Sequence, residues 1–117
     1  MFKFENLKVW QKSLDFIDLI YSLTKNFPKE ETFGLTSQTR RASVSVALNI
    51  AEGSGKTTNK EFRKFLHDSL GSLRESVTLL IICKRQILIS NEQFLKAYAM
   101  AEEISKMIYK LGLKIID

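Results

Sequence analysis

The sequence has few residues that break helices and few that form cross-links. Among its 117 residues there are five glycines, one proline and one cysteine. A β-sandwich needs turn residues about every 8–12 positions, so this scarcity indicates long helices. The lone Cys83 excludes an internal disulfide and argues against a cysteine-based zinc site. We therefore expect an all-α protein whose core forms without a metal or other cofactor.

Long apolar runs are also missing. No stretch approaches the roughly 18 residues of a membrane span, and residues 1–5 lack the apolar core of a signal peptide. These absences predict a cytoplasmic protein with no membrane partner. Hydrophobic residues make up 44% of the chain and charged residues 26%, a balance typical of a folded protein. The length predicts a single domain over residues 1–117.

Acidic residues are fewer than basic ones. Lys and Arg number 18 against 13 Asp and Glu, which gives a net charge of +5 and an isoelectric point near 9.4. Such an excess permits nucleic acid as a partner without requiring it, because ordinary surface lysines produce the same balance.

Apolar residues at steps of three and four predict four helices. The first covers residues 7–27 before Pro28, and the second covers residues 35–51. The third begins at a capping box, Thr58 to Glu61, and continues to about residue 88. The fourth begins at a second capping box, Ser90 to Gln93. Short connections make consecutive helices antiparallel, so we expect an up-down antiparallel four-helix bundle, with Gly71 allowing a close helix crossing.

The second predicted helix has a narrow polar stripe on an otherwise apolar or small surface. Its members fall within roughly 80° of one another: Gln38, Arg41, Ser45, Asn49 and Glu52. A helix of this kind packs on several sides, which implies a subunit interface. Buried polar groups persist when they are paired, so we interpret the stripe as a structural network in preference to a ligand site.

Two ladders of charge follow the third predicted helix. Arg63, Arg74 and Arg85 recur every eleven residues and lie within roughly 40° of one another, with His67 beside them. Acidic residues recur every seven on a stripe about 120° away: Glu61, Asp68 and Glu75. The arginines could contact phosphates, or the basic stripe of one subunit could meet the acidic stripe of the next in a ring. Both interpretations stay open.

The loop at residues 53–58 (GSGKTT) superficially suggests nucleotide binding. A P-loop needs a glycine where this chain has Ile50, so we do not expect nucleotide hydrolysis. Its Lys56 is instead counted with the basic residues that could bind nucleic acid. His67 has no nucleophile near it in the pattern, and no other set of residues assembles an active site. An enzyme is therefore not expected.

Several short blocks resemble one known family. They are residues 7–12 (LKVWQK), 27–30 (FPKE), 33–38 (FGLTSQ), 40–42 (RRA), 49–53 (NIAEG), 65–66 (FL) and 71–72 (GS). These blocks resemble the 23S rRNA intervening-sequence proteins. The resemblance implies four-helix subunits that close into a homopentameric ring. It also extends to the accessory variability protein of diversity-generating retroelements, which binds a reverse transcriptase and nucleic acid.

The expected function is therefore that of a non-enzymatic, oligomeric bundle that binds RNA or DNA through a basic surface. The candidate residues for that surface are Arg63, His67, Arg74, Arg85 and Lys56. The alternative is a protein-interaction scaffold or accessory subunit without direct contact to nucleic acid, acting with a protein partner such as a reverse transcriptase.

Overall fold

A computed structural model describes residues 1–115 and contains four α-helices. These are α1 (Lys8–Thr24), α2 (Ser37–Ser54), α3 (Asn59–Arg85) and α4 (Asn91–Lys114). Short helical turns at Lys3–Asn6, Lys29–Glu31 and Thr32–Thr36 precede α1 and α2. Within residues 1–115 no segment forms a strand, which confirms the all-α prediction.

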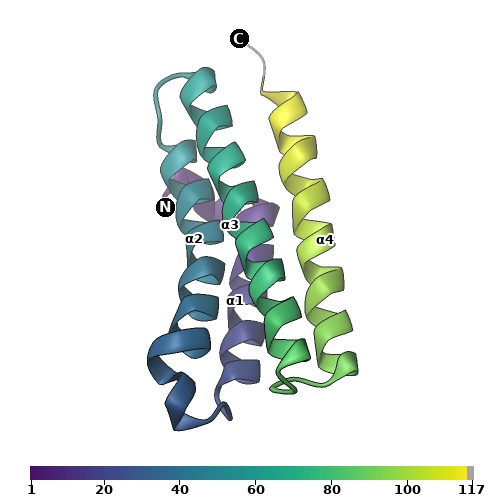
Figure 1. Cartoon of the computed structure of the whole chain (residues 1–117). Coiled ribbons are helices and arrows are strands. Elements are labelled where there is room, and N and C mark those ends of the chain that lie inside the picture. Colours follow the sequence, from purple (N-terminus) through teal and green to yellow (C-terminus); the bar gives the residue numbers. More distant parts are fainter. Residues whose placement is uncertain (116–117) are drawn as a thin grey trace.

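The four helices run alternately up and down along one long axis (Figure 1). Each helix packs against two others, so that α1 contacts α2, α2 contacts α3, α3 contacts α4, and α4 returns to α1. The molecule is an elongated bundle of 47 × 23 × 22 Å. Short connections between long helices produce this arrangement, because a chain that turns back at once must place its next helix alongside the last.

Local side-chain chemistry sets where α3 and α4 begin. The Thr58 hydroxyl accepts a hydrogen bond of 3.1 Å from the Glu61 amide, and the Ser90 hydroxyl accepts one of 3.0 Å from the Gln93 amide. Gln93 in turn accepts from the Ser90 amide at 2.8 Å, which completes the second capping box. Both predicted starts are confirmed, but only the second capping box is complete, because the Glu61 carboxylate accepts from the Thr58 hydroxyl instead of the Thr58 amide.

Two helices end earlier than their apolar patterns predict. Helix α1 ends at Thr24, where the chain turns so that the Phe27 amide donates to the Thr24 carbonyl at 3.1 Å. Helix α3 ends at Arg85 because Ile87 adopts a left-handed backbone conformation with φ of 61°. The Leu88 amide then donates back to the Cys83 carbonyl at 2.9 Å, which satisfies a free carbonyl at the helix end.

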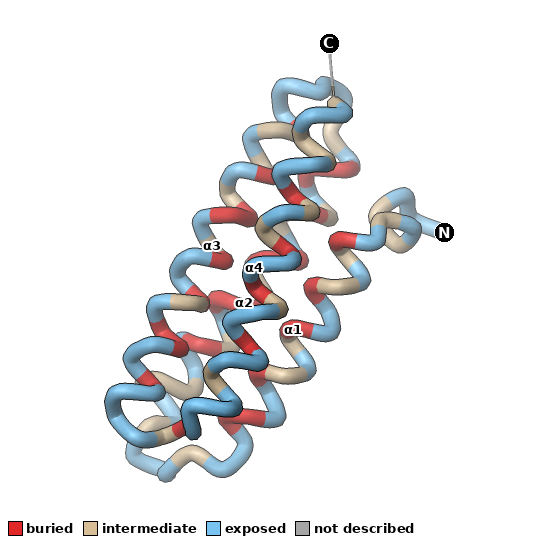
Figure 2. Tube along the Cα trace, turned by 90° about the vertical axis from the view of Figure 1, so that its right-hand side faces the viewer, coloured by how far each residue is buried: buried red, intermediate tan, exposed pale blue. Residues whose placement is uncertain are grey.

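Apolar side chains fill the space between the helices. Buried positions lie on the inward side of every helix and exposed positions on the outward side (Figure 2). The largest completely buried apolar side chains come from all four helices: Phe16, Ile20, Val46, Ile50, Leu80, Ile104 and Ile108. Burial of this kind supplies most of the stability of an amphipathic helix, which is why the period of three and four was informative.

The close approach between helices occurs at Gly53 and not at Gly71. A Cβ placed on Gly53 would lie 2.7 Å from the Phe65 Cβ, which is closer than real carbon atoms approach. Gly71 faces outward, and nothing lies within 4 Å of a Cβ placed there. The expectation for Gly71 was therefore wrong for contacts within the chain, because its helix presents that position to solvent.

The outer surface of α2 is only partly covered by the rest of the chain. Leu48 is 62% exposed, Tyr21 on the adjoining α1 is 43% exposed, and Val44 is half-buried. We call Tyr21, Val44 and Leu48 the α1/α2 face. The sequence predicted that α2 packs on several sides, and this face is the part of it that no segment within residues 1–115 covers.

Candidate nucleic-acid interface

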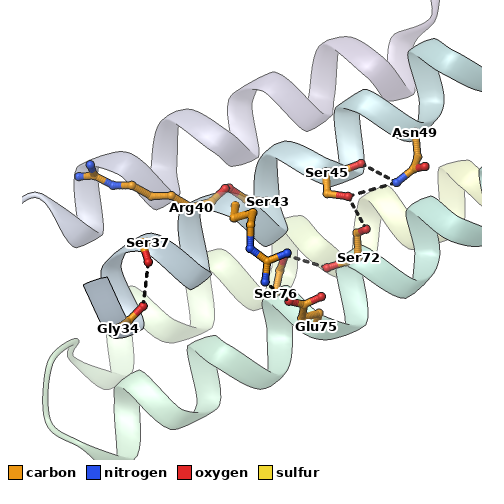
Figure 3. Close-up of polar contacts among 10 residues, drawn as sticks. Gly34, Ser37, Arg40, Ser43, Ser45, Asn49, Ser72, Glu75 and Ser76 are labelled. Atoms are coloured by element: carbon orange, nitrogen blue, oxygen red, sulfur yellow. Dashed lines mark hydrogen bonds and ion pairs between the residues drawn. The ribbon is translucent and has the colours of Figure 1, made fainter. Parts of the chain in front are cut away.

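The polar stripe of α2 forms separate contacts instead of one network. Asn49 donates its side-chain amide to the Ser45 carbonyl at 3.0 Å and to the Ser45 hydroxyl at 3.2 Å. The Ser45 and Ser72 hydroxyls lie 2.8 Å apart, so this part of the stripe links α2 to α3 (Figure 3). Ser45 and Asn49 are the members that the structure brings together.

The other members of the stripe lie at the surface. The Arg41 guanidinium is 3.4 Å from the Glu75 carboxylate, and the Glu52 carboxylate is 3.1 Å from the Lys56 ammonium group. Gln38 is exposed in the first turn of α2. Exposed pairs of this kind contribute little to stability, so the stripe does not behave as a buried ionic network.

Small buried side chains fill the α2–α3 contact, and one buried serine makes a polar link across it. Ser43, Ser69 and Ser76 are completely buried, and the Ser69 hydroxyl donates 2.8 Å across to the Val46 carbonyl. Ser69, Ser76 and Cys83 recur every seven residues along α3, which places them on one side of the helix. We call this side of α3 the α2/α3 seam.

Cys83 belongs to the α2/α3 seam as a packing residue. Its side chain is fully buried, and its Sγ lies 4.0 Å from the Thr39 hydroxyl. Burial raises the pKa of the Cys83 thiol, because the anionic thiolate is poorly solvated there. The neutral thiol therefore persists at physiological pH, and a nucleophilic role is not supported.

The acidic ladder of α3 is engaged within its own chain. The Asp68 carboxylate lies 3.1 Å from the Lys64 ammonium group, and the Glu75 carboxylate pairs with Arg41 of α2. Glu61 accepts a hydrogen bond of 3.0 Å from the Thr58 hydroxyl at the start of the helix. These intramolecular contacts give each acid a role that needs no second subunit.

Three of the five predicted basic residues share one groove. Arg63, His67 and Arg74 project from α3 into a shallow groove between α3 and α4. Leu70 and Tyr109 line both of two adjoining hollows, so we treat these hollows as the two halves of one groove. We call it the α3/α4 groove. Arg63 is half-buried and donates a hydrogen bond of 2.9 Å to the Ile115 carbonyl, whereas His67 and Arg74 are exposed.

Arg85 and Lys56 do not line this groove. Arg85 is exposed in the last turn of α3, at the end of the bundle away from Arg63. Lys56 lies on the α2 side of α3, where it pairs with Glu52 and its ammonium group sits 5.2 Å from the centre of the Phe65 ring. The structure therefore gathers three of the five predicted basic residues along the groove and leaves the other two outside it.

Helix α4 contributes two tyrosines and one acid that sequence reasoning missed. Tyr98 is 37% exposed and Tyr109 is 56% exposed, and both line the α3/α4 groove. Glu102 lines the same half of the groove as Arg74. The tyrosines are eleven residues apart, the same interval as the arginines, and that shared interval was the available signal.

Residues 1–115 contain neither a metal-binding cluster nor a membrane-spanning helix. In that range no three His, Cys, Asp or Glu side chains gather in a group that could hold a metal ion. None of the helices described combines the length and the apolar character needed to cross a membrane.

The fold and groove define a class: an antiparallel four-helix bundle with a basic, aromatic groove along two of its helices. Residues 5–110 match the family model for the 23S rRNA-intervening sequence protein, and the chain belongs to that family. It is similar to a solved structure of a protein of unknown function from the S23 ribosomal protein family of Bacteroides thetaiotaomicron. That similarity has a TM-score of 0.79 and 25% identity over 89% of this chain and 97% of the other. No curated protein sequence matches the chain.

Proposed function

We propose that this protein is a non-enzymatic bundle that binds nucleic acid through the α3/α4 groove. The observation that carries the proposal is the convergence of Arg63, His67 and Arg74 on one groove. Guanidinium groups present forked donors that match pairs of phosphate oxygens. The net charge of +5 adds a long-range attraction for a polyanion. The name of the family, which refers to 23S rRNA, agrees with a role near nucleic acid.

Salt dependence provides the test, because each neutralised phosphate releases counterions. One contact contributes about 0.9 log units of affinity per log unit of salt on a duplex and about 0.7 on a single strand. The double variant Arg63→Gln/Arg74→Gln should therefore flatten the slope by about 1.4–1.8 log units. Fluorescence anisotropy with labelled RNA and DNA at several salt concentrations measures the slope.

Two control variants make this test specific to the groove. Lys25→Gln/Lys29→Gln removes the same charge from exposed positions near the end of α1, and it should leave the slope within error of the parent. Arg85→Gln tests whether binding depends on the groove or on the whole row of arginines along α3. Arg85 lies in the same row as Arg63 and Arg74 but does not line the groove. A groove variant that binds like the parent, with folding verified by circular dichroism, would contradict the proposal.

A second proposal concerns self-association, and the exposed α1/α2 face favours it. Leu48 and Tyr21 expose apolar surface that a second copy of the chain would bury. We propose a homo-oligomer built through this face, with the ring of five subunits that the family resemblance implies. Sedimentation or light scattering should then give a mass near five times 13.5 kDa.

A charged substitution on this face tests the assembly directly. Leu48→Glu places a carboxylate in the proposed contact and should lower the mass. Leu95→Glu, at a position 53% exposed on α4, introduces the same change elsewhere and should leave the mass unchanged. A stable monomer of the parent at micromolar concentration would remove this proposal. An intact oligomer that fails to bind nucleic acid would instead favour a scaffold that acts with a protein partner, such as a reverse transcriptase.

A further inference from the structure

We infer that the α3/α4 groove takes single-stranded nucleic acid, with bases stacked on Tyr109 and Tyr98. The inference rests on the proposed function and specifies the form of nucleic acid that is bound. It follows from two ladders that face each other: arginines on the α3 wall of the groove and tyrosines on the α4 wall.

The two ladders have the same spacing. Arg63 and Arg74 are eleven residues apart on α3, and Tyr98 and Tyr109 are eleven residues apart on α4. Eleven residues make about three turns and about 16 Å of helix, so each pair stays on one line. Because the helices are antiparallel (Figure 1), the Tyr109 end of α4 lies beside the Arg63 end of α3. Tyr98 shares the other half of the groove with Arg74.

The walls differ in the part of a nucleotide that they suit. Arginine is a partner for the backbone phosphate, whereas a partly exposed tyrosine ring offers a surface on which any base can stack. Apolar side chains form the floor, including Leu70, Val77 and Ala101. Glu102 stands on the tyrosine wall and disfavours phosphate there, which places the backbone on the α3 side.

A duplex does not satisfy this arrangement. Its base faces are covered by neighbouring base pairs, so a tyrosine in a groove could reach one only by unstacking the helix. A single strand can turn its bases toward one wall and its phosphates toward the other. Thr78 and Ser105 line the same half of the groove. The Thr78 hydroxyl donates to the Arg74 carbonyl at 2.9 Å and keeps its oxygen as an acceptor for a base edge or the ribose.

Tyr109 provides the sharper test of the two tyrosines. The Tyr98 ring centre lies 5.6 Å from that of Phe94, so its loss would also disturb packing within α4. Tyr109 is more exposed and lines both halves of the groove. The variants are Tyr109→Leu, which removes the aromatic ring, and Tyr109→Phe, which keeps the ring and removes only the hydroxyl.

The experiment measures affinity for three probes: a short RNA of mixed sequence, the same RNA annealed to its complement, and a single-stranded DNA of the same sequence. The parent should bind the single strands more tightly than the duplex. One stacked base contributes about 1–3 kcal/mol, so Tyr109→Leu should weaken single-strand binding about 5–150-fold. Tyr109→Phe should stay within about twofold of the parent, because stacking depends on the ring. Neither variant should change the salt slope, since neither removes a cation.

The outcomes separate this inference from the proposed function. If the duplex binds as tightly as the single strands and Tyr109→Leu changes neither, the inference fails while the proposed function stands. If the parent binds none of the three probes, the proposed function fails and the inference with it. If Tyr109→Leu loses binding and oligomer mass together, the groove is a subunit contact and the inference is overturned. A preference for RNA over DNA, or none, agrees with the inference, because both strands expose base faces.

Discussion

Helix α3 has two neighbours and meets them in different ways. At the α2/α3 seam, Gly53 and buried serines allow close contact, and hydrogen bonds such as Ser69 to the Val46 carbonyl cross between the helices. Toward α4, larger side chains line the edges and a groove remains. The comparison suggests that one side of α3 provides rigidity and the other provides a surface where a ligand can bind.

The largest difference should come from placing leucine on each side. Ser69→Leu adds bulk at a fully buried position and removes a hydrogen bond, so we expect a loss of about 3 kcal/mol in the free energy of unfolding. Ser105→Leu makes the same change in the α3/α4 groove, where Ser105 is half-buried, and should stay within about 0.5 kcal/mol. Urea unfolding at one protein concentration measures both. Equal losses of unfolding free energy in the two variants would show that the two sides of α3 are packed equally tightly.

Glycine substitutions should give effects of opposite sign. Gly53→Ala forces a Cβ to within 2.7 Å of the Phe65 Cβ, and the resulting overpacking should cost about 1–2 kcal/mol. Gly71→Ala meets nothing within 4 Å and should gain about 1 kcal/mol from helix propensity. Thermal unfolding of the two variants provides the comparison. If Gly53→Ala stabilised the protein, the helices at the α2/α3 seam would be able to shift and accommodate the added Cβ, despite its 2.7 Å distance from the Phe65 Cβ.

The pH dependence of stability should report on Cys83 in the seam. Because burial raises the pKa of this thiol, its contribution is fully present below the pKa of the unfolded thiol, about 8.5. That contribution is lost as pH rises toward and through the higher pKa of the folded state. The unfolding free energy of the parent should therefore fall more steeply in alkaline solution than that of Cys83→Ala. Parallel curves from urea unfolding between neutral and alkaline pH would contradict this.

The smallest effect should come from the exposed ion pair at the edge of the seam. The side chains of Arg41 and Glu75 are 70% and 46% exposed, and their charged atoms are 3.4 Å apart. Water and salt screen such a pair, so Arg41→Ala should cost less than about 0.5 kcal/mol. A double-mutant cycle with Glu75→Ala isolates the pair. A coupling well above this value would make the pair part of the rigid seam.

Local chemistry explains what the sequence could predict. Thr58 and Ser90 begin their helices through bonds to residues only three positions away, and apolar periodicity reflects one helix at a time. The role of a glycine depends on what faces it, so sequence alone could not separate Gly53 from Gly71. The partner of Glu75 likewise comes from another helix.

The candidate site was predicted only in part, because it too depends on how two helices pack against each other. The interval between Arg63 and Arg74 placed them on one line of α3, and each lines one half of the α3/α4 groove. The interval also included Arg85, which does not line the groove, because spacing along one helix does not show how far a groove shared with a second helix extends. Tyr98 and Tyr109 were missed because the side of α4 that turns toward α3 is decided by packing between the two helices.

The left-handed residue in the turn between α3 and α4 offers a practical route to engineering the protein. Ile87 is branched at Cβ, adopts φ of 61°, and exposes 88% of its surface. An L-residue held in that conformation costs about 1–2 kcal/mol, and glycine adopts it freely. Since the Ile87 side chain makes few contacts to lose, Ile87→Gly should raise the melting temperature. The resulting background would keep destabilised variants folded long enough to be purified and assayed.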